Sequence, residues 1–209
     1  MFHDRRSAGE ALAGAVLSRV AGLHCRVYGL ARGGIVVARP VAERLVAPLD
    51  VLVACKVGAP GQPEYAVGAV AEGGGVYWDS EALDSLGLGP LWCERAAAAA
   101  RVEVERRTRH YRGRPLEVDA AALAIVVDDG LATGSTVMAA LRGLAALGVG
   151  ARAVAVPVAS REALELLSGE AEWTFALETP DPLFAVGAHY QEFGPVEDEE
   201  LLRVLGRTA

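Results

Sequence analysis

Residues 124–140, A-I-V-V-D-D-G-L-A-T-G-S-T-V-M-A-A, are the stretch from which the fold of this chain can be argued. Ile125, Val126 and Val127 form an apolar β-branched run, which is typical of a strand buried on both faces of a parallel sheet. Two carboxylates and a loop of small residues follow. Apolar residues at helical spacing then resume over 137–147. The stretch therefore predicts a strand, a loop and a helix, which is the repeating unit of an α/β fold.

The small-residue loop in this stretch is suited to hold a phosphate group. Its glycines allow the backbone to approach a ligand closely, and the amides that open the following helix favour an anion. Thr133, Ser135 and Thr136 add hydroxyl donors. The preceding carboxylates of Asp128 and Asp129 can accept hydrogen bonds from the vicinal hydroxyls of a ribose. An ordinary strand-to-helix turn, capped by one of the two aspartates, is the alternative interpretation.

The run V-V-D-D-G-L-A-T-G-S-T closely resembles the phosphoribosyl-diphosphate (PRPP) binding motif of type I phosphoribosyltransferases. The resemblance implies that Asp128 and Asp129 are the catalytic carboxylates, which orient the ribose and share an Mg²⁺ ion through water. Asp129 is also a candidate general base toward the acceptor. The residues that the resemblance assigns to the 5-phosphate are Gly130, Ala132, Thr133, Gly134, Ser135 and Thr136.

Other phosphate-binding motifs do not fit this loop. A Walker A loop needs a lysine before its last Ser or Thr, and a dinucleotide fingerprint needs G-x-G-x-x-G. A phospho-accepting receiver domain also pairs aspartates at strand ends, but it needs a lysine on a later strand. The chain has a single lysine, Lys56, which precedes the motif.

A second glycine loop, A-R-G-G at 31–34, separates an expected strand over Val27 to Leu30 from a helix that runs to about Val46. Backbone amides and one guanidinium group suit a pyrophosphate. The loop resembles the pyrophosphate loop of the family, which often contains a non-proline cis peptide, here expected between Ala31 and Arg32. A tight turn with a surface arginine is the alternative. The residues that the resemblance assigns to the diphosphate are Ala31, Arg32, Gly33, Gly34 and Lys56.

Lys56 follows an apolar run over 50–55 that predicts a third buried strand. Ligands of open α/β sheets gather at the carboxyl ends of the strands, so this lysine is placed to meet an anion. A surface lysine with its stem on the protein is equally compatible with the sequence.

Between the two glycine loops the chain departs from the strand-helix rhythm. Glycines and prolines over 58–65 predict an irregular loop, and the resemblance makes it a candidate for the flexible loop that closes over the diphosphate. Glu64 and Tyr65 are then functional, or else part of an exposed turn. Residues 67–79 predict a hairpin at the sheet edge, and 91–111 predict one long helix whose arginines form a solvated face.

The two ends of the chain flank this core. Ser7 to Val20 predicts a first helix with Ser7 as its cap, preceded by residues that either close over a pocket or fray. After the motif, strands are expected at 153–158 and 173–177, with a helix over 161–167 between them. Residues 178–197 are irregular and aromatic. The resemblance makes them the hood that binds the acceptor, with Phe184 and Tyr190 as stacking platforms, whereas a structural aromatic cluster is the alternative.

The sequence predicts one α/β domain over 1–209, with a core at about 26–158 and a hood at about 178–197. Its 209 residues, of which 52% are hydrophobic, are enough for one substantial core. The expected fold is a doubly wound, mostly parallel five-stranded sheet, type I phosphoribosyltransferase-like, with a small hood or edge hairpin.

Composition restricts the partners and the compartment. The net charge of −7 argues against nucleic acid, and a charged N-terminus without a long apolar run argues against a membrane, so we expect a cytoplasmic protein. Cys25, Cys55 and Cys93 are widely spaced, which indicates buried free thiols. The absence of asparagine suggests a thermophile, although a GC-rich genome gives the same bias.

The function implied by the resemblance is transfer of a 5-phosphoribosyl group from PRPP to a nitrogen nucleophile, such as a nucleobase, with release of diphosphate. The expected partners are PRPP and a small-molecule acceptor, with Mg²⁺ as cofactor, and a homodimer is compatible with the sequence. The alternative is a PRPP-sensing regulatory protein that has the same fold without catalytic activity.

Overall fold

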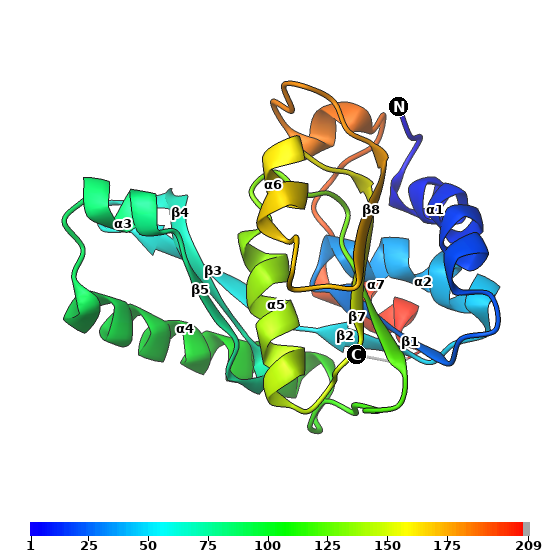
Figure 1. The fold of residues 1–209 in the computed structure, drawn as a ribbon, viewed down its shortest axis with the longest axis horizontal. Helices are drawn as coiled ribbons and strands as arrows, with labels where there is room; N and C mark the ends of the chain where they lie inside the picture. Colours follow the sequence, from blue (N-terminus) through cyan, green and yellow to red (C-terminus); the bar gives the residue numbers. More distant parts are fainter. Residues whose placement is uncertain (207–209) are drawn as a thin grey trace.

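The computed structural model describes residues 1–206; residues 207–209 of the expected domain lie outside it. Five parallel strands form the main sheet, and three antiparallel strands form a smaller sheet beside it (Figure 1). The prediction of a mostly parallel five-stranded α/β sheet is confirmed. In spatial order the main sheet consists of β2 (Leu49–Leu52), β1 (Cys25–Leu30), β6 (Leu123–Val127), β7 (Arg152–Val158) and β8 (Trp173–Glu178).

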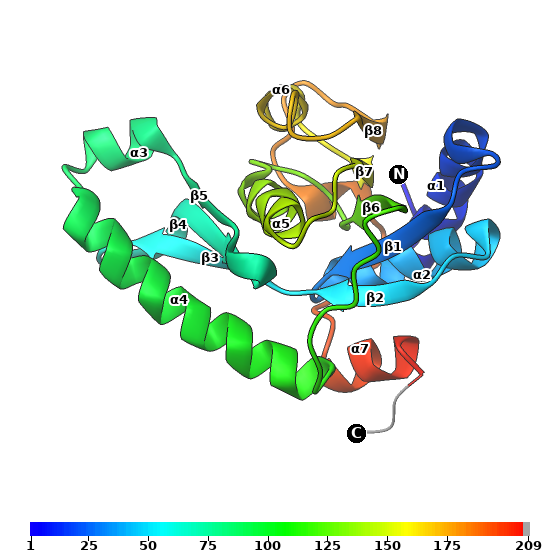
Figure 2. The same ribbon diagram turned by 60° about the horizontal axis from the view of Figure 1, so that its bottom comes forward.

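Helices cover both faces of the main sheet (Figure 2). α1 (Arg5–Val20) and α2 (Gly33–Leu45) pack on the face that Val27, Ile125 and Ala153 present. α5 (Ser135–Ala146) and α6 (Arg161–Leu166) pack on the opposite face. Because helices cover both faces, every residue of β6 is buried, as its apolar run predicts.

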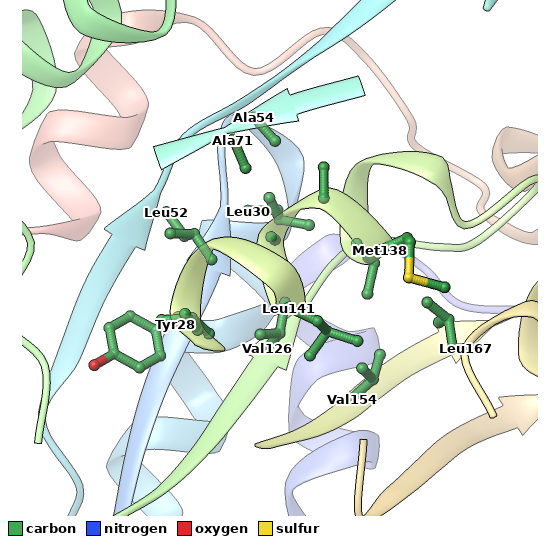
Figure 3. Packing of buried hydrophobic residues seen from close by; sticks show 14 of the residues in the cluster. Tyr28, Leu30, Leu52, Ala54, Ala71, Val126, Met138, Leu141, Val154 and Leu167 are labelled. Carbon is green, nitrogen blue, oxygen red and sulfur yellow. The ribbon is translucent and has the colours of Figure 1, made fainter. Parts of the chain in front are cut away.

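The core beneath α5 joins the two sheets. Figure 3 shows Leu141 of α5 over Val126, with Tyr28 and Val154 on the neighbouring strands. Ala71 of the smaller sheet belongs to the same buried cluster. α5 therefore lies between the two sheets and fixes the loop at its own N-terminus relative to both.

The apolar run over 50–55 is not one strand, as the sequence predicts, but two. β2 ends at Leu52, and β3 (Ala54–Ala59) belongs to the smaller sheet. Between them, the backbone of Val53 hydrogen-bonds to Glu72 instead of a strand neighbour: its amide donates to the side-chain Oε2 of Glu72 at 3.1 Å, and its carbonyl accepts from the Glu72 amide at 3.0 Å. Lys56 consequently stands on β3 and not at the end of a main-sheet strand.

The smaller sheet and two helices form an arm that extends from the main sheet (Figure 2). The expected hairpin over 67–79 pairs within this separate sheet and not at the edge of the main one. The prediction of an irregular loop over 58–65 is wrong as well, because β3 and β4 pair through this segment, with register shifts on both sides of Gly58. The elements of the arm are β3, β4 (Gln62–Ala71), η1 (Glu72–Gly74), β5 (Val76–Trp78), α3 (Ser80–Ser85) and α4 (Pro90–Tyr111).

The N-terminus is anchored to the hood and does not fray. The Phe2 amide donates to the His189 carbonyl at 2.8 Å, and the Phe2 carbonyl accepts from the Gln191 amide at 2.9 Å. Asp4, not Ser7, caps α1: the Ser7 amide donates to Asp4 Oδ1 at 2.7 Å, and Ser7 completes the capping box. The hood contains η2 (Val186–His189) and leads into α7 (Asp198–Val204).

Two further properties concern residues 1–206. None of their helices combines the length and apolarity needed to cross a membrane. Their three cysteines are free, but Cys93 is partly exposed, contrary to the expectation that all three are buried.

Candidate functional site

A cavity of about 490 Å³ opens where the two glycine loops meet the arm. β1 and the loop after it form one wall, and the acidic pair with Thr136 forms the floor. β3 and α4 form the remaining wall. The lining residues are Leu30, Ala31, Arg32, Gly33, Ala54, Cys55, Lys56, Ala100, Glu103, Arg107, Asp128, Asp129 and Thr136. The cavity thus brings together residues at 31–33, Lys56, the acidic pair and Thr136, which the sequence assigns to one ligand. The other residues assigned to that ligand do not line it: Gly34, Gly130, Ala132, Thr133, Gly134 and Ser135.

The acidic pair lies at the carboxyl end of β6, in the centre of the main sheet. The Asp129 amide donates to Asp128 Oδ1 at 2.9 Å. Desolvation raises the pKa of Asp128 well above its ordinary value, and the adjacent charge of Asp129 acts in the same direction. Lys56 and Arg5 oppose this shift through their positive charges. Asp128 therefore retains a proton at higher pH than an exposed aspartate.

The loop at residues 130–134 is tied to the end of β7. The Leu131 amide donates to the Val158 carbonyl at 2.9 Å, and Ser160 Oγ donates to the Ala132 carbonyl at 2.8 Å. Gly134 adopts a φ of 76° and starts α5. The amides of the first turn of a helix have no intrahelical acceptor, so this loop presents donors and the positive end of the helix dipole.

The hydroxyl groups at the start of α5 gather around this helix end. Thr133 Oγ1 and Ser135 Oγ lie 3.1 Å apart, and Thr136 lines the cavity. A Cβ on Gly130 would collide with Val186 of the hood, so a glycine is needed there for packing. The arrangement is a suitable anion site, and the assignment of these residues to the 5-phosphate stays a prediction.

The loop at 31–34 approaches the acidic pair from β1. The peptide between Ala31 and Arg32 is cis, which confirms the prediction for this bond. A Cβ on Gly34 would lie 2.6 Å from the Val127 carbonyl oxygen, and a Cβ on Gly33 would collide with the carboxylate of Asp129. Both glycines are therefore required by close approach of the two loops.

Arg32 lines the cavity, but its guanidinium group faces α7. Its Nη1 lies 3.5 Å from Asp198 Oδ1 and 3.7 Å from Glu197 Oε2. Asp198 also accepts a hydrogen bond of 2.8 Å from Tyr111 Oη, and burial together with this contact raises the pKa of Tyr111 to about 12. An anion in the cavity would compete with the α7 carboxylates for Arg32.

α4 contributes two charged residues to the cavity, although the sequence predicts only a solvated face for the arginines of this helix. Arg107 and Glu103 line the cavity, and Arg107 Nε donates to Glu103 Oε1 at 2.6 Å. Nothing in the helix sequence distinguishes Arg107 from the other arginines, because only the packing of the arm decides which of them faces the site.

The two hood residues differ in their surroundings. Phe184 is 90% exposed. Tyr190 is buried, and its ring stacks on Phe193 and tilts against Phe2. Its hydroxyl group donates to the Asp129 carbonyl at 2.6 Å, so a stacking role would require the ring to leave these contacts. The proposed acceptor platforms stay predictions.

Comparison with known proteins identifies the family. A family model described as the phosphoribosyl transferase domain matches residues 24–192, which include both glycine loops and the acidic pair. The chain belongs to this family. The matched span begins after α1, so the phosphoribosyl transferase domain as matched does not include Arg5.

Similar proteins are found in Thermus thermophilus and in Mycobacterium tuberculosis. A crystal structure of TT1426 from Thermus thermophilus is 44% identical, with a TM-score of 0.79, and the match covers 98% of this chain and 97% of that one. Two proteins provisionally named phosphoribosyl transferases, from Mycobacterium tuberculosis strains CDC 1551 and H37Rv, are 37% identical over 218 residues. The match covers 99% of this chain, which spans about half the length (47%) of these two relatives.

Proposed function

We propose that this protein transfers a 5-phosphoribosyl group from PRPP to a nitrogen nucleophile, such as a nucleobase, and releases diphosphate. The observation that supports the proposal most directly is the shared cavity of the 31–33 loop, Lys56 and the acidic pair. It joins, in one space of about 490 Å³, residue types suited to a diphosphate and to a ribose.

In the proposed reaction the chain binds each part of PRPP with a different element. The start of α5, with Thr133 and Ser135, receives the 5-phosphate. Asp128 and Asp129 accept hydrogen bonds from the ribose hydroxyls, and the cations Arg32 and Lys56 hold the diphosphate. The transition state of such a transfer has oxocarbenium character, so the site must retain the leaving group and exclude water.

The donor set suits Mg²⁺. The acidic pair at the cavity provides two carboxylates, and among residues 1–206 no cluster of three or more potential metal ligands occurs. Mg²⁺ is commonly held by one or two carboxylates, with water and substrate phosphates completing its shell. Asp128 and Asp129 would hold such an ion through water, and when bound it would neutralise charge on the leaving diphosphate.

The acceptor has to enter between the ribose and the hood. Phe184 is exposed and is one candidate platform, and Tyr190 would become one only after rearrangement. Asp129 is the candidate general base toward the acceptor nitrogen.

The test is diphosphate release from PRPP with a panel of nucleobases, in the presence of Mg²⁺. We expect one acceptor to support turnover and the Asp128→Asn/Asp129→Asn variant to bind PRPP about tenfold to a hundredfold more weakly, because hydrogen bonds to charged groups are lost. Calorimetry with PRPP gives the affinities. PRPP binding without turnover for any acceptor would favour the PRPP-sensing alternative, and no binding would refute both.

A further inference from the structure

Arg5, at the start of α1, reaches the acidic pair from the opposite end of the sequence. Its Nε donates to Asp129 Oδ2 at 2.7 Å, and the two side chains are only 11% and 18% exposed. An ion pair with so little solvent contact is screened far less than a surface pair. It involves Oδ2 of Asp129 and not Oδ1.

Several segments hold the guanidinium group of Arg5 in place. Its Nη1 donates to the Gly194 carbonyl at 2.7 Å, and its Cζ lies 3.9 Å from the centroid of the Phe193 ring. The capping box between Asp4 and Ser7 fixes the first turn of α1, from which Arg5 projects. Arg5 is therefore oriented independently of any ligand in the cavity.

Asp129 is confined from other directions as well. The Tyr190 hydroxyl group donates to its backbone carbonyl at 2.6 Å. The Cα of Gly33 lies so close that an added Cβ would collide with Oδ2 of Asp129 and stand 2.9 Å from Arg5 Nε. The carboxylate thus has one orientation, which Arg5, Gly33 and the hood define together.

We propose that Arg5 is a positioning residue for phosphoribosyl transfer. It holds Asp129 so that Oδ1 of this carboxylate meets the ribose hydroxyls, and its positive charge offsets the negative charge of the acidic pair. This inference rests on the proposed function. Two adjacent carboxylates repel the phosphates of PRPP, and a cation in direct contact with one of them reduces that repulsion. The ion pair leaves Oδ1 of Asp129 free for the ligand, because Arg5 contacts only Oδ2.

The test compares Arg5→Gln, Arg5→Lys and Arg6→Gln. Arg6 is the matched control, because it is the next residue, is 76% exposed and pairs with Glu10 on its own helix. We expect Arg5→Gln to weaken PRPP binding and to lower kcat/KM about ten- to a hundredfold, which is typical when the partner of a binding group is removed. Arg5→Lys keeps the charge without the planar fork and should restore part of this loss. Arg6→Gln should match the wild type.

A cycle with Asp129→Asn separates positioning from a merely structural role. If Arg5 acts through Asp129, Arg5→Gln has no further effect on PRPP affinity in the Asp129→Asn background. An undiminished effect there, or wild-type affinity for Arg5→Gln, would overturn the inference. If Arg5→Gln does not fold, Arg5→Lys takes its place in the cycle, with the same criterion. Failure of the wild type to bind PRPP would instead refute the proposed function.

Discussion

At the residue scale, the two carboxyl groups of the acidic pair have different surroundings. Asp129 is held by a guanidinium group, whereas Asp128 is desolvated and accepts one backbone hydrogen bond, from the Asp129 amide. The raised pKa of Asp128 means that the folded chain binds a proton that the unfolded chain releases. By linkage, this group lowers the free energy of unfolding as pH rises above its unfolded value of 3.8 toward its folded value.

We therefore predict that Asp128→Asn raises the melting temperature at pH 7 and that the gain becomes small at about pH 4, where the unfolded wild type has begun to bind the proton that the folded wild type already holds. The amide oxygen of asparagine can keep the hydrogen bond from the Asp129 amide. Thermal unfolding of both proteins between pH 4 and pH 8 checks this. A difference in melting temperature that does not change with pH would contradict it.

The two glycines after Arg32 give a second prediction at this scale. Gly33→Ala should weaken PRPP binding roughly a hundredfold and cost less stability than Gly34→Ala, because its Cβ meets a side chain and would push the carboxylate of Asp129 aside by about an ångström. Gly34→Ala should cost about 2 kcal/mol of stability, because its Cβ meets the backbone of Val127 and Asp128. Calorimetry and denaturant unfolding of the two variants separate these effects, and equal losses of stability would refute the distinction.

At the scale of the element, α4 forms one wall of the cavity, although its sequence predicts a face of solvated charges. Arg106 and Arg107 both pair with Glu103, at 2.7 Å and 2.6 Å, but only Arg107 is among the residues that line the cavity. The Arg106 side chain is 60% exposed. Glu103 thus pairs with one arginine at the surface, Arg106, and with one at the cavity, Arg107.

We predict that Arg107→Gln weakens diphosphate binding about tenfold, because a charge-assisted hydrogen bond to phosphate is lost. Arg106→Gln should bind diphosphate like the wild type, although it removes a hydrogen bond to the same glutamate. Competition of diphosphate with PRPP measures both. Equal affinities for the two variants would show that α4 does not contact the diphosphate.

At the scale of the whole molecule, a buried ion pair joins the two sheets where the chain passes from β2 to β3. Arg112 contacts both carboxylate oxygens of Glu72 and donates to the Val51 carbonyl at 2.7 Å. Its side chain is fully buried, and that of Glu72 is 9% exposed. Glu72 also accepts from the Val53 amide, so one carboxylate fixes both the crossing point and the base of the arm.

We predict that Glu72→Gln lowers the free energy of unfolding by about 3 kcal/mol, because the buried guanidinium group of Arg112 loses its ion pair with this carboxylate. The control is Glu170→Gln, which removes the exposed pair with Arg142 at 3.2 Å and should cost less than about 1 kcal/mol. Urea unfolding gives both values. Similar costs for the two variants would show that the Glu72 pair does not stabilise the joint between the sheets.

The sequence alone determined the main sheet and the two loops at its centre. Continuous apolar runs such as 125–127 predict buried parallel strands because both faces of such a strand are covered, and loop glycines mark close approach because no side chain fits there. The order of strand, acidic pair and small-residue loop is local in the chain. The cis bond after Ala31 followed from the family resemblance of its loop.

Only the tertiary structure decided which distant residues meet at these loops. Arg5, Arg107 and Asp198 lie far from both loops in the sequence, and no local pattern distinguishes them from other charged surface residues. The break at Val53 was likewise hidden, because an apolar run does not show which sheet supplies its hydrogen bonds. Periodicity records burial along one element, whereas a site is made by packing between elements, and that packing depends on the whole chain.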